Sequence, residues 1–175
     1  SRTYSIVVNF SAPLKVYHKL NAIILEDDPS QSFQHNVCVG KEWYRFPSNF
    51  FLPQNAELHF LKSGFEGLLP KPFGKTWEIP STMNDQNRME PDRYVDAATC
   101  HYIIDLGLQQ QTEPKYHQDK QNWEEMYIHP FLFSEGSAVW SRSFYIPGIS
   151  AAFNEYRGYY ILKNKNSAAV SARQY

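Results

Sequence analysis

The chain has 175 residues, a length that suits one domain, because such a chain buries roughly two thirds or more of its unfolded surface. Its 17 basic and 18 acidic residues give a formal net charge of -1. Nucleic-acid binding needs a clustered positive surface, so we expect no nucleic-acid partner. Aromatic residues make up 16% of the chain, and we expect some of them on a surface that meets sugar or protein.

No apolar run reaches the roughly eighteen residues that a membrane-spanning helix needs, and no charged-then-apolar leader is present. Taken alone, the chain is therefore expected to be soluble. It begins at Ser1 without a methionine, and both a processed protein and a piece of a longer protein fit this start.

The first predicted helix lies near the amino end. Residues 3–10 are expected to form a short strand or an extended arm. Residues 12–26 are predicted to be a helix, because Ser11 suits its cap and Pro13 its first turn. The apolar residues that recur there at helical spacing are Leu14, Tyr17, Leu20, Ile23 and Ile24.

Four strands are predicted in the rest of the chain, because short runs there are apolar or alternating and rich in β-branched and aromatic residues. They span residues 36–39, 57–62, 101–107 and 156–163. A short helix is expected over 49–52. His59 and His101 fall in predicted strands, where a hydrogen-bonded core histidine is the ordinary outcome.

A second long helix is predicted over residues 119–128, with Asp119 as its cap and Pro130 after its end. Residues 137–146 are ambiguous between helix and strand. Residues 64–77 are predicted to be a loop, because glycine and proline recur there. The apolar residues expected to hold this loop in place are Phe65, Leu68, Leu69, Phe73 and Trp77.

These elements favour an α/β fold in a single domain, with a mixed β-sheet of about four or more strands flanked by helices and long loops. Residues 1–35 form the arm and first helix, 36–163 the core, and 164–175 a polar tail that is expected to be disordered. The sequence contains no internal repeat.

Cys38 and Cys100 are the two cysteines of the chain. In a secreted or luminal protein they would pair, whereas in a cytosolic protein they would be two buried thiols. Asn9 begins an N-x-S tripeptide, a glycosylation acceptor site, and this favours a luminal location and the disulfide.

The sequence shows no catalytic or metal-binding motif. No pair of the six histidines has the spacing of a helical metal site, and the two cysteines do not form a CxxC. Neither a G-x-S-x-G elbow nor a glycine-rich nucleotide loop is present. We therefore expect no metal and no cofactor, and we assign no catalytic residue.

Polar and aromatic residues gather in three short stretches, the first of them directly after the strand that ends at Gly40. Strands hold their ends still, so such residues form a surface on a rigid edge. A sugar-binding surface uses these residue types, and a packed protein interface uses the same ones. The candidates are Lys41, Glu42, Trp43, Tyr44 and Arg45, then Asn84, Asp85 and Asn87, then Arg93 and Tyr94.

Several blocks along the chain resemble one enzyme family. They include CVGKEWYRFPS over 38–48, GLLPKPF over 67–73, MNDQN over 83–87 and CHY over 100–102. The sequence resembles the carboxy-terminal luminal region of the dolichyl-phosphate-mannose-dependent α-1,2-mannosyltransferases of asparagine-linked glycosylation. These enzymes form part of glycosyltransferase family 22 and have the GT-C architecture.

The resemblance implies a multi-spanning enzyme of the endoplasmic reticulum membrane, which moves mannose from dolichyl-phosphate-mannose onto a growing lipid-linked oligosaccharide. This chain would be its luminal tail, and residues 1–35 would follow the membrane portion. The catalytic carboxylate of such an enzyme lies in the membrane portion, so the chain by itself is expected to be inactive. Its implied partners are the membrane portion, the lipid-linked acceptor, and the donor bound elsewhere in the enzyme.

The resemblance leaves two roles open for the candidate residues. They contact the branched mannose acceptor, or they dock the domain on the membrane portion or stabilise a turn. A function of another class is a free-standing luminal lectin or interaction module. That alternative predicts measurable binding of mannose oligosaccharide by the isolated chain, whereas the enzyme-tail interpretation predicts little or none.

Overall fold

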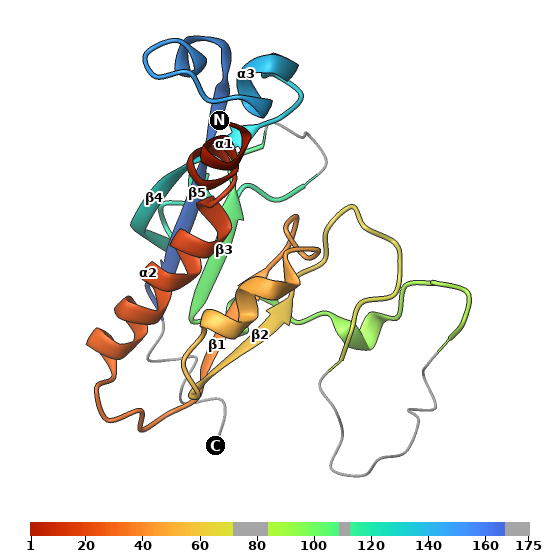
Figure 1. The fold of residues 1–175 in the computed structure, drawn as a ribbon. Coiled ribbons are helices and arrows are strands. Elements are labelled where there is room, and N and C mark those ends of the chain that lie inside the picture. Colours follow the sequence, from red (N-terminus) through yellow and green to blue (C-terminus); the bar gives the residue numbers. More distant parts are fainter. Residues whose placement is uncertain (72–83, 109–112, 167–175) are drawn as a thin grey trace.

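The computed structural model describes residues 1–71, 84–108 and 113–166, and its centre is a mixed five-stranded sheet (Figure 1). The strands are β1 (His35–Val39), β2 (Ala56–Phe60), β3 (Tyr102–Leu106), β4 (Trp123–Phe133) and β5 (Glu155–Asn164). Their order in the sheet is β2-β1-β3-β5-β4. The first three strands are parallel to one another, and β5 is antiparallel to both of its neighbours. The predicted mixed α/β fold is confirmed, with one strand more than the four that were located.

Helix α2 (Ala12–Asp27) covers one face of the sheet and confirms the predicted first helix. Val16, Leu20 and Ile24 lie on one side of this helix and are fully buried. Leu14 was expected on the same side, but its side chain is exposed. The other helices are α1 (Arg2–Asn9) and α3 (Val139–Ser143), which pack against each other at one end of the molecule (Figure 1).

The strands send alternate side chains to two separate hydrophobic clusters, as their period of two requires. Val37 and Val39 of β1 join the cluster beneath α2. Cys38, which lies between them, joins the smaller cluster on the opposite face, together with Ile103 and Leu162. The sheet is therefore covered on both of its faces.

The prediction of a strand or extended arm over residues 3–10 is wrong, because this segment is helix α1. Its β-branched run suggests a strand, but the residues that it buries are Ser5 and Asn9, one helical turn apart. Both are polar, and a search for apolar periodicity passes over them.

The prediction of a helix over 119–128 is also wrong, since β4 occupies most of this segment and continues to Phe133. Strand β4 pairs along its whole length with β5, with a register shift between Glu125 and Tyr127. That irregularity interrupts the strand period and hides it in the sequence. Pro130 is tolerated because β4 lies at the edge of the sheet, where one side of the strand needs no ladder hydrogen bonds.

The remaining expectations are partly met. The ambiguous segment 137–146 contains the short helix α3, and a 3-10 helix, η1 (Phe46–Phe51), overlaps the predicted helix over 49–52. The part of the predicted loop that is described contains no helix or strand, whereas residues 72–77 of it lie outside the described residues. Asn164 was expected to begin a disordered tail, but it is buried and ends β5. The last nine residues of that tail lie outside the described residues as well.

Candidate functional site

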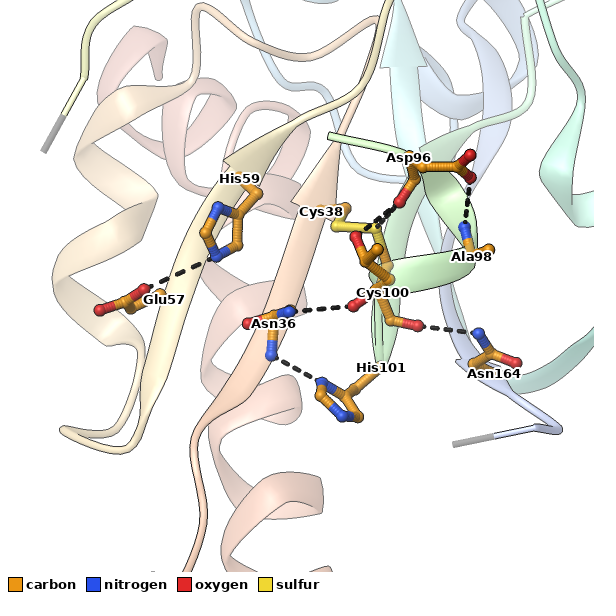
Figure 2. Close-up of a disulfide and its surroundings, with 10 residues drawn as sticks. Asn36, Cys38, Glu57, His59, Asp96, Ala98, Cys100, His101 and Asn164 are labelled. Atoms are coloured by element: carbon orange, nitrogen blue, oxygen red, sulfur yellow. Dashed lines mark hydrogen bonds and ion pairs between the residues drawn. A yellow bond between two sulfur atoms is a disulfide. The ribbon is translucent and has the colours of Figure 1, made fainter. Parts of the chain in front are cut away.

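A disulfide joins Cys38 to Cys100, with their Cα atoms 5.9 Å apart, and confirms the predicted pairing (Figure 2). Cys38 is the last residue but one of β1, and Cys100 lies two residues before β3 begins. Both side chains are fully buried on the sheet face opposite α2. The bond therefore ties the entry of β3 to its neighbour β1.

Polar contacts surround the disulfide (Figure 2). The Asn36 backbone N–H donates to Nδ1 of His101 at 2.8 Å, and its side-chain amide donates to the Thr99 carbonyl at 2.9 Å. The Asn164 amide donates to the Cys100 carbonyl at 2.9 Å. Burial lowers the pKa of His101 to about 4, and the neighbouring His35 adds to this effect. His101 is thus the hydrogen-bonded core histidine that its place near a buried strand predicts.

The candidate residues 41–45 lie at the edge of the sheet where the parallel strands β1, β2 and β3 all end. In open sheets, the loops that follow parallel strands meet beyond the carboxyl ends of the strands and form binding sites there. Three such loops meet here. These loops bring together side chains, one of which contacts Asp105 of β3, and Asp105 in turn contacts His117 of the segment after β3. We call this group of side chains the carboxyl-end cluster. It consists of Lys41, Glu42, Trp43, Tyr44, Arg45, Phe65, Asp105 and His117.

Lys41 points into the protein rather than toward solvent. Its Nζ lies 2.9 Å from Oδ1 of Asp105 and donates to the Pro114 carbonyl at 3.2 Å. The other carboxylate oxygen of Asp105 accepts from the His117 backbone N–H at 3.1 Å and lies 2.6 Å from Nδ1 of its ring. Both Lys41 and Asp105 have buried side chains, so the ion pair holds the turn after β1 against β3.

Glu42 and Arg45 form a second ion pair within the same turn. Glu42 is only 3% exposed. Burial raises the pKa of its carboxyl group, and the Arg45 guanidinium offsets this only in part. The guanidinium lies over the Phe131 ring at 4.5 Å and over the Tyr44 ring at 4.8 Å, and it donates to the Tyr44 hydroxyl at 3.1 Å. Tyr44 itself is 53% exposed and is the member of residues 41–45 that solvent reaches most.

Trp43 stacks on Phe65, with 3.8 Å between the ring centroids and 24° between the ring planes. The Phe65 carbonyl accepts from the Tyr94 hydroxyl at 3.3 Å and from Nζ of Lys62 at 3.2 Å. Phe65 therefore links the turn after β1 to the segment that holds the other candidate residues.

The remaining candidates mostly organise that segment. The Asn84 side chain accepts from the Gln86 and Arg88 backbone N–H groups and donates to Glu90 at 2.7 Å. The Asn87 side chain accepts from the Leu68 N–H at 3.0 Å. Asp85 is exposed, whereas Arg93 is buried, with its Nη2 3.4 Å from a Glu90 carboxylate oxygen. Three of the candidates, Tyr44, Asp85 and Asn87, are exposed, and the Asn87 side chain is already engaged by the Leu68 N–H.

Asp105 and His117 were not among the candidates. Asp105 carries the charge within the otherwise apolar strand YIIDL, and a buried charge needs a partner. That isolated charge could have predicted a buried ion pair. Lys41, which comes directly after a parallel strand, was the cation that could pair with it. His117 lies in a polar connection and gave no comparable signal.

Comparison with known proteins shows which family the chain is similar to. Residues 1–53 match the model of the Alg9-like mannosyltransferase family. Over nearly its whole length, the chain is 40% identical to the alpha-1,2-mannosyltransferase ALG9 of Homo sapiens, in a match of 181 residues that covers 97% of this chain. The chain is similar to the Alg9-like mannosyltransferases over nearly its whole length. It is also 36% identical to the alpha-1,2-mannosyltransferase alg9 of Schizosaccharomyces pombe and 35% identical to ALG9 of Saccharomyces cerevisiae, over 86% and 84% of this chain.

The chain spans 29% of the length of the human relative and 28% of each yeast relative. No solved structure matches it. Within residues 1–71, 84–108 and 113–166, no helix has the length and apolar character needed to cross a membrane. The same parts of the chain hold no group of three or more histidine, cysteine or acidic side chains that could bind a metal ion.

Asn9, the predicted glycosylation acceptor, is the last residue of α1 and is buried. Its side-chain amide donates to the Ser5 hydroxyl at 2.8 Å, and its carbonyl oxygen accepts from the Tyr156 hydroxyl at 3.0 Å. A glycan on this nitrogen would require α1 to leave these contacts. Glycosylation of Asn9 stays a prediction.

Proposed function

We propose that this chain is the luminal carboxy-terminal part of an α-1,2-mannosyltransferase of the endoplasmic reticulum membrane. The whole enzyme transfers mannose from dolichyl-phosphate-mannose to the lipid-linked oligosaccharide used in protein N-glycosylation. The observation that carries this proposal is the 40% identity to the human alpha-1,2-mannosyltransferase across nearly the whole chain. The disulfide supports a luminal location, because such bonds persist in oxidising compartments.

In this proposal the catalytic group lies in the membrane portion of the enzyme, and residues 1–71, 84–108 and 113–166 of the domain act in support of it. Glycosyl transfer needs a carboxylate or another base that is free to act on the acceptor hydroxyl. The two buried carboxylates of the carboxyl-end cluster are already engaged, Asp105 by Lys41 and His117, and Glu42 by Arg45. These pairs hold the turn after β1 in place and leave the chemistry to the membrane portion of the enzyme.

The role of the domain is to help seat the branched acceptor. Tyr44 is the best candidate for contact with the acceptor, because its ring is exposed and the Arg45 guanidinium lies over the ring. Aromatic faces held in this way are suited to packing against a sugar ring. The other four residues of this turn hold Tyr44 in position, because their own side chains are engaged within the protein. They are Lys41, Glu42, Trp43 and Arg45.

The test of the activity uses the full-length protein in membranes, with dolichyl-phosphate-mannose carrying labelled mannose and a lipid-linked oligosaccharide acceptor. We expect labelled mannose in the oligosaccharide, in a linkage that an α-1,2-specific mannosidase cleaves. A folded full-length protein that transfers no mannose, or transfers it in another linkage, would contradict the proposal. The 175-residue chain alone is expected to transfer none.

A further inference from the structure

Helix α1 has the reverse of the polarity expected for a helix on a protein surrounded by water. Its buried residues, Ser5 and Asn9, are polar. Its apolar residues face outward, with Ile6 56% and Val7 58% exposed. A helix at the surface of a protein in water normally buries its apolar stripe and exposes the polar one.

The buried polar groups of α1 act as hydrogen-bonding contacts to the rest of the domain. The Ser5 hydroxyl donates to the Arg142 carbonyl at 2.7 Å and accepts from the Asn9 amide. Asn9 in turn accepts from the Tyr156 hydroxyl on β5. The helix is thus attached through polar contacts, which leaves its apolar side chains available for another partner.

Helix α3 and the segment that follows it are built in the same way. The Ser141 hydroxyl donates to the Asn154 side chain at 2.6 Å, and the Ser150 hydroxyl donates to the Phe144 carbonyl at 3.0 Å. Both serines are fully buried. The exposed apolar residues of this region are Val139, Trp140, Phe144, Ile146, Ile149 and Phe153.

These two regions form one surface, which we call the apolar end, where α1 and α3 lie together at one end of the molecule (Figure 1). It consists of the six exposed apolar residues of the α3 region together with Tyr4, Ile6, Val7 and Phe10. Between α1 and the segment after α3 there is a hollow of about 530 Å³, lined mainly by Tyr4, Val7, Tyr145 and Pro147.

The charge of the apolar end has one sign. The charged side chains within residues 1–14 and 136–153 are Arg2 and Arg142, and these two segments contain no acidic residue. Arg142 is partly exposed and also donates to the Ser134 carbonyl at 2.9 Å. Arginines beside exposed aromatic and aliphatic side chains suit the boundary of a phospholipid bilayer, where phosphate groups lie next to acyl chains. Small and polar residues that join helices from within are also typical of packing in an apolar surrounding.

We propose that the apolar end inserts into the surface of a phospholipid bilayer, with its aromatic and aliphatic side chains among the acyl chains and Arg2 and Arg142 at the phosphates. This inference goes beyond the proposed function, because it requires neither mannose transfer nor the membrane portion of the enzyme. Failure of vesicle binding would leave the enzyme assignment standing, and failure of mannose transfer would leave the vesicle result standing.

The first test uses the 175-residue chain, with its disulfide intact and its fold checked by circular dichroism. It is mixed with vesicles of phosphatidylcholine alone or of phosphatidylcholine with phosphatidylserine. We expect the chain to sediment with both, more strongly with the anionic lipid, and brominated lipid to quench its fluorescence less in the Trp140→Phe variant. Ile6→Asp is expected to weaken binding by about tenfold or more, because a charge replaces an inserted side chain.

The matched control is Ile128→Asp, since Ile128 is 48% exposed on β4, away from the apolar end, and carries the same side chain. It is expected to bind vesicles as the parent chain does. Equal binding by the two variants, no binding by the parent chain, or self-association through Ile6 in place of vesicle binding would each overturn the proposal.

A second measurement uses the full-length protein in vesicles, so that the outcome does not depend on the behaviour of the chain alone. We expect Val7→Cys and Val139→Cys to react slowly with a water-soluble maleimide and quickly with a lipid-soluble one. Ile128→Cys is expected to react quickly with the water-soluble reagent. The contrary outcome is that the cysteine at position 7 or 139 crosslinks to the protein's membrane portion and does not react with the lipid-soluble reagent. The partner of the apolar end would then be protein, and the bilayer proposal would be wrong.

Discussion

The Lys41 ammonium group lies 2.9 Å from the Asp105 carboxylate, and both side chains are buried. This pair connects the first residue of the turn after β1 to the carboxyl end of the neighbouring strand β3. The turn carries Tyr44, so the position of the exposed ring depends on an ion pair that solvent does not reach.

Removing one partner of this pair should destabilise the domain strongly. Lys41→Met leaves the Asp105 carboxylate buried with His117 alone, and a broken buried pair typically costs about 3 to 5 kcal/mol. We expect a loss of this size in the free energy of unfolding, measured by urea denaturation. The double variant Lys41→Met with Asp105→Leu should recover part of it. A double variant less stable than either single one would contradict this interpretation of the pair.

The disulfide should contribute about 4 kcal/mol to stability, since it closes a loop with a sequence separation of 62. We expect the variant with both Cys38→Ala and Cys100→Ala to lose about this amount in urea denaturation. Adding a reductant should lower the midpoint of the parent chain and leave the variant unchanged. A midpoint that does not respond to reductant would show that the bond does not form.

Acid should weaken the domain through His101. In the folded chain the pKa of this residue is lowered from 6.5 to about 4, because the ring is buried and lies beside His35. The unfolded chain therefore binds a proton between these two pH values that the folded chain does not bind, and stability falls as pH falls through this window. The contribution of His101 is present in full above pH 6.5, and about 3 kcal/mol of it is lost by pH 4.

The measurement is the urea midpoint as a function of pH for the parent chain and for His101→Gln, whose amide can still accept from the Asn36 N–H. The variant should show a shallower fall between pH 6.5 and 4. The pKa of His35 is lowered as well, so part of the slope should remain. Identical slopes for the two proteins would rule out His101 as the source.

Sequence patterns predicted the elements whose apolar residues repeat regularly. Helix α2 and strands β1, β2, β3 and β5 lie close to their expected positions. Helix α1 was missed because its inward side is polar, and β4 was missed because an irregularity breaks its alternation. In both cases the conformation depends on a distant partner, β5, whose contacts no local window contains.

In the candidate site too, the sequence predicted the local feature but not the contacts with distant residues. The turn after β1 was located because a strand that ends on glycine and leads into charged and aromatic residues is a local feature. Its geometry depends on Asp105, His117 and Phe65, which come from two other loops and a neighbouring strand. For that reason the sequence did not distinguish the exposed Tyr44 from Lys41 and Glu42, whose charges are neutralised inside the protein.

The acceptor-seating role is tested most directly by steady-state kinetics of the full-length enzyme with Tyr44→Ala, while the concentration of the lipid-linked acceptor is varied. We expect the acceptor KM to rise by about two- to tenfold, the range that one aromatic contact supplies, with kcat and the donor KM little changed. Tyr44→Phe should lie between the parent and Tyr44→Ala, and Ile128→Ala should behave as the parent. An unchanged acceptor KM in a folded Tyr44→Ala enzyme would contradict the role.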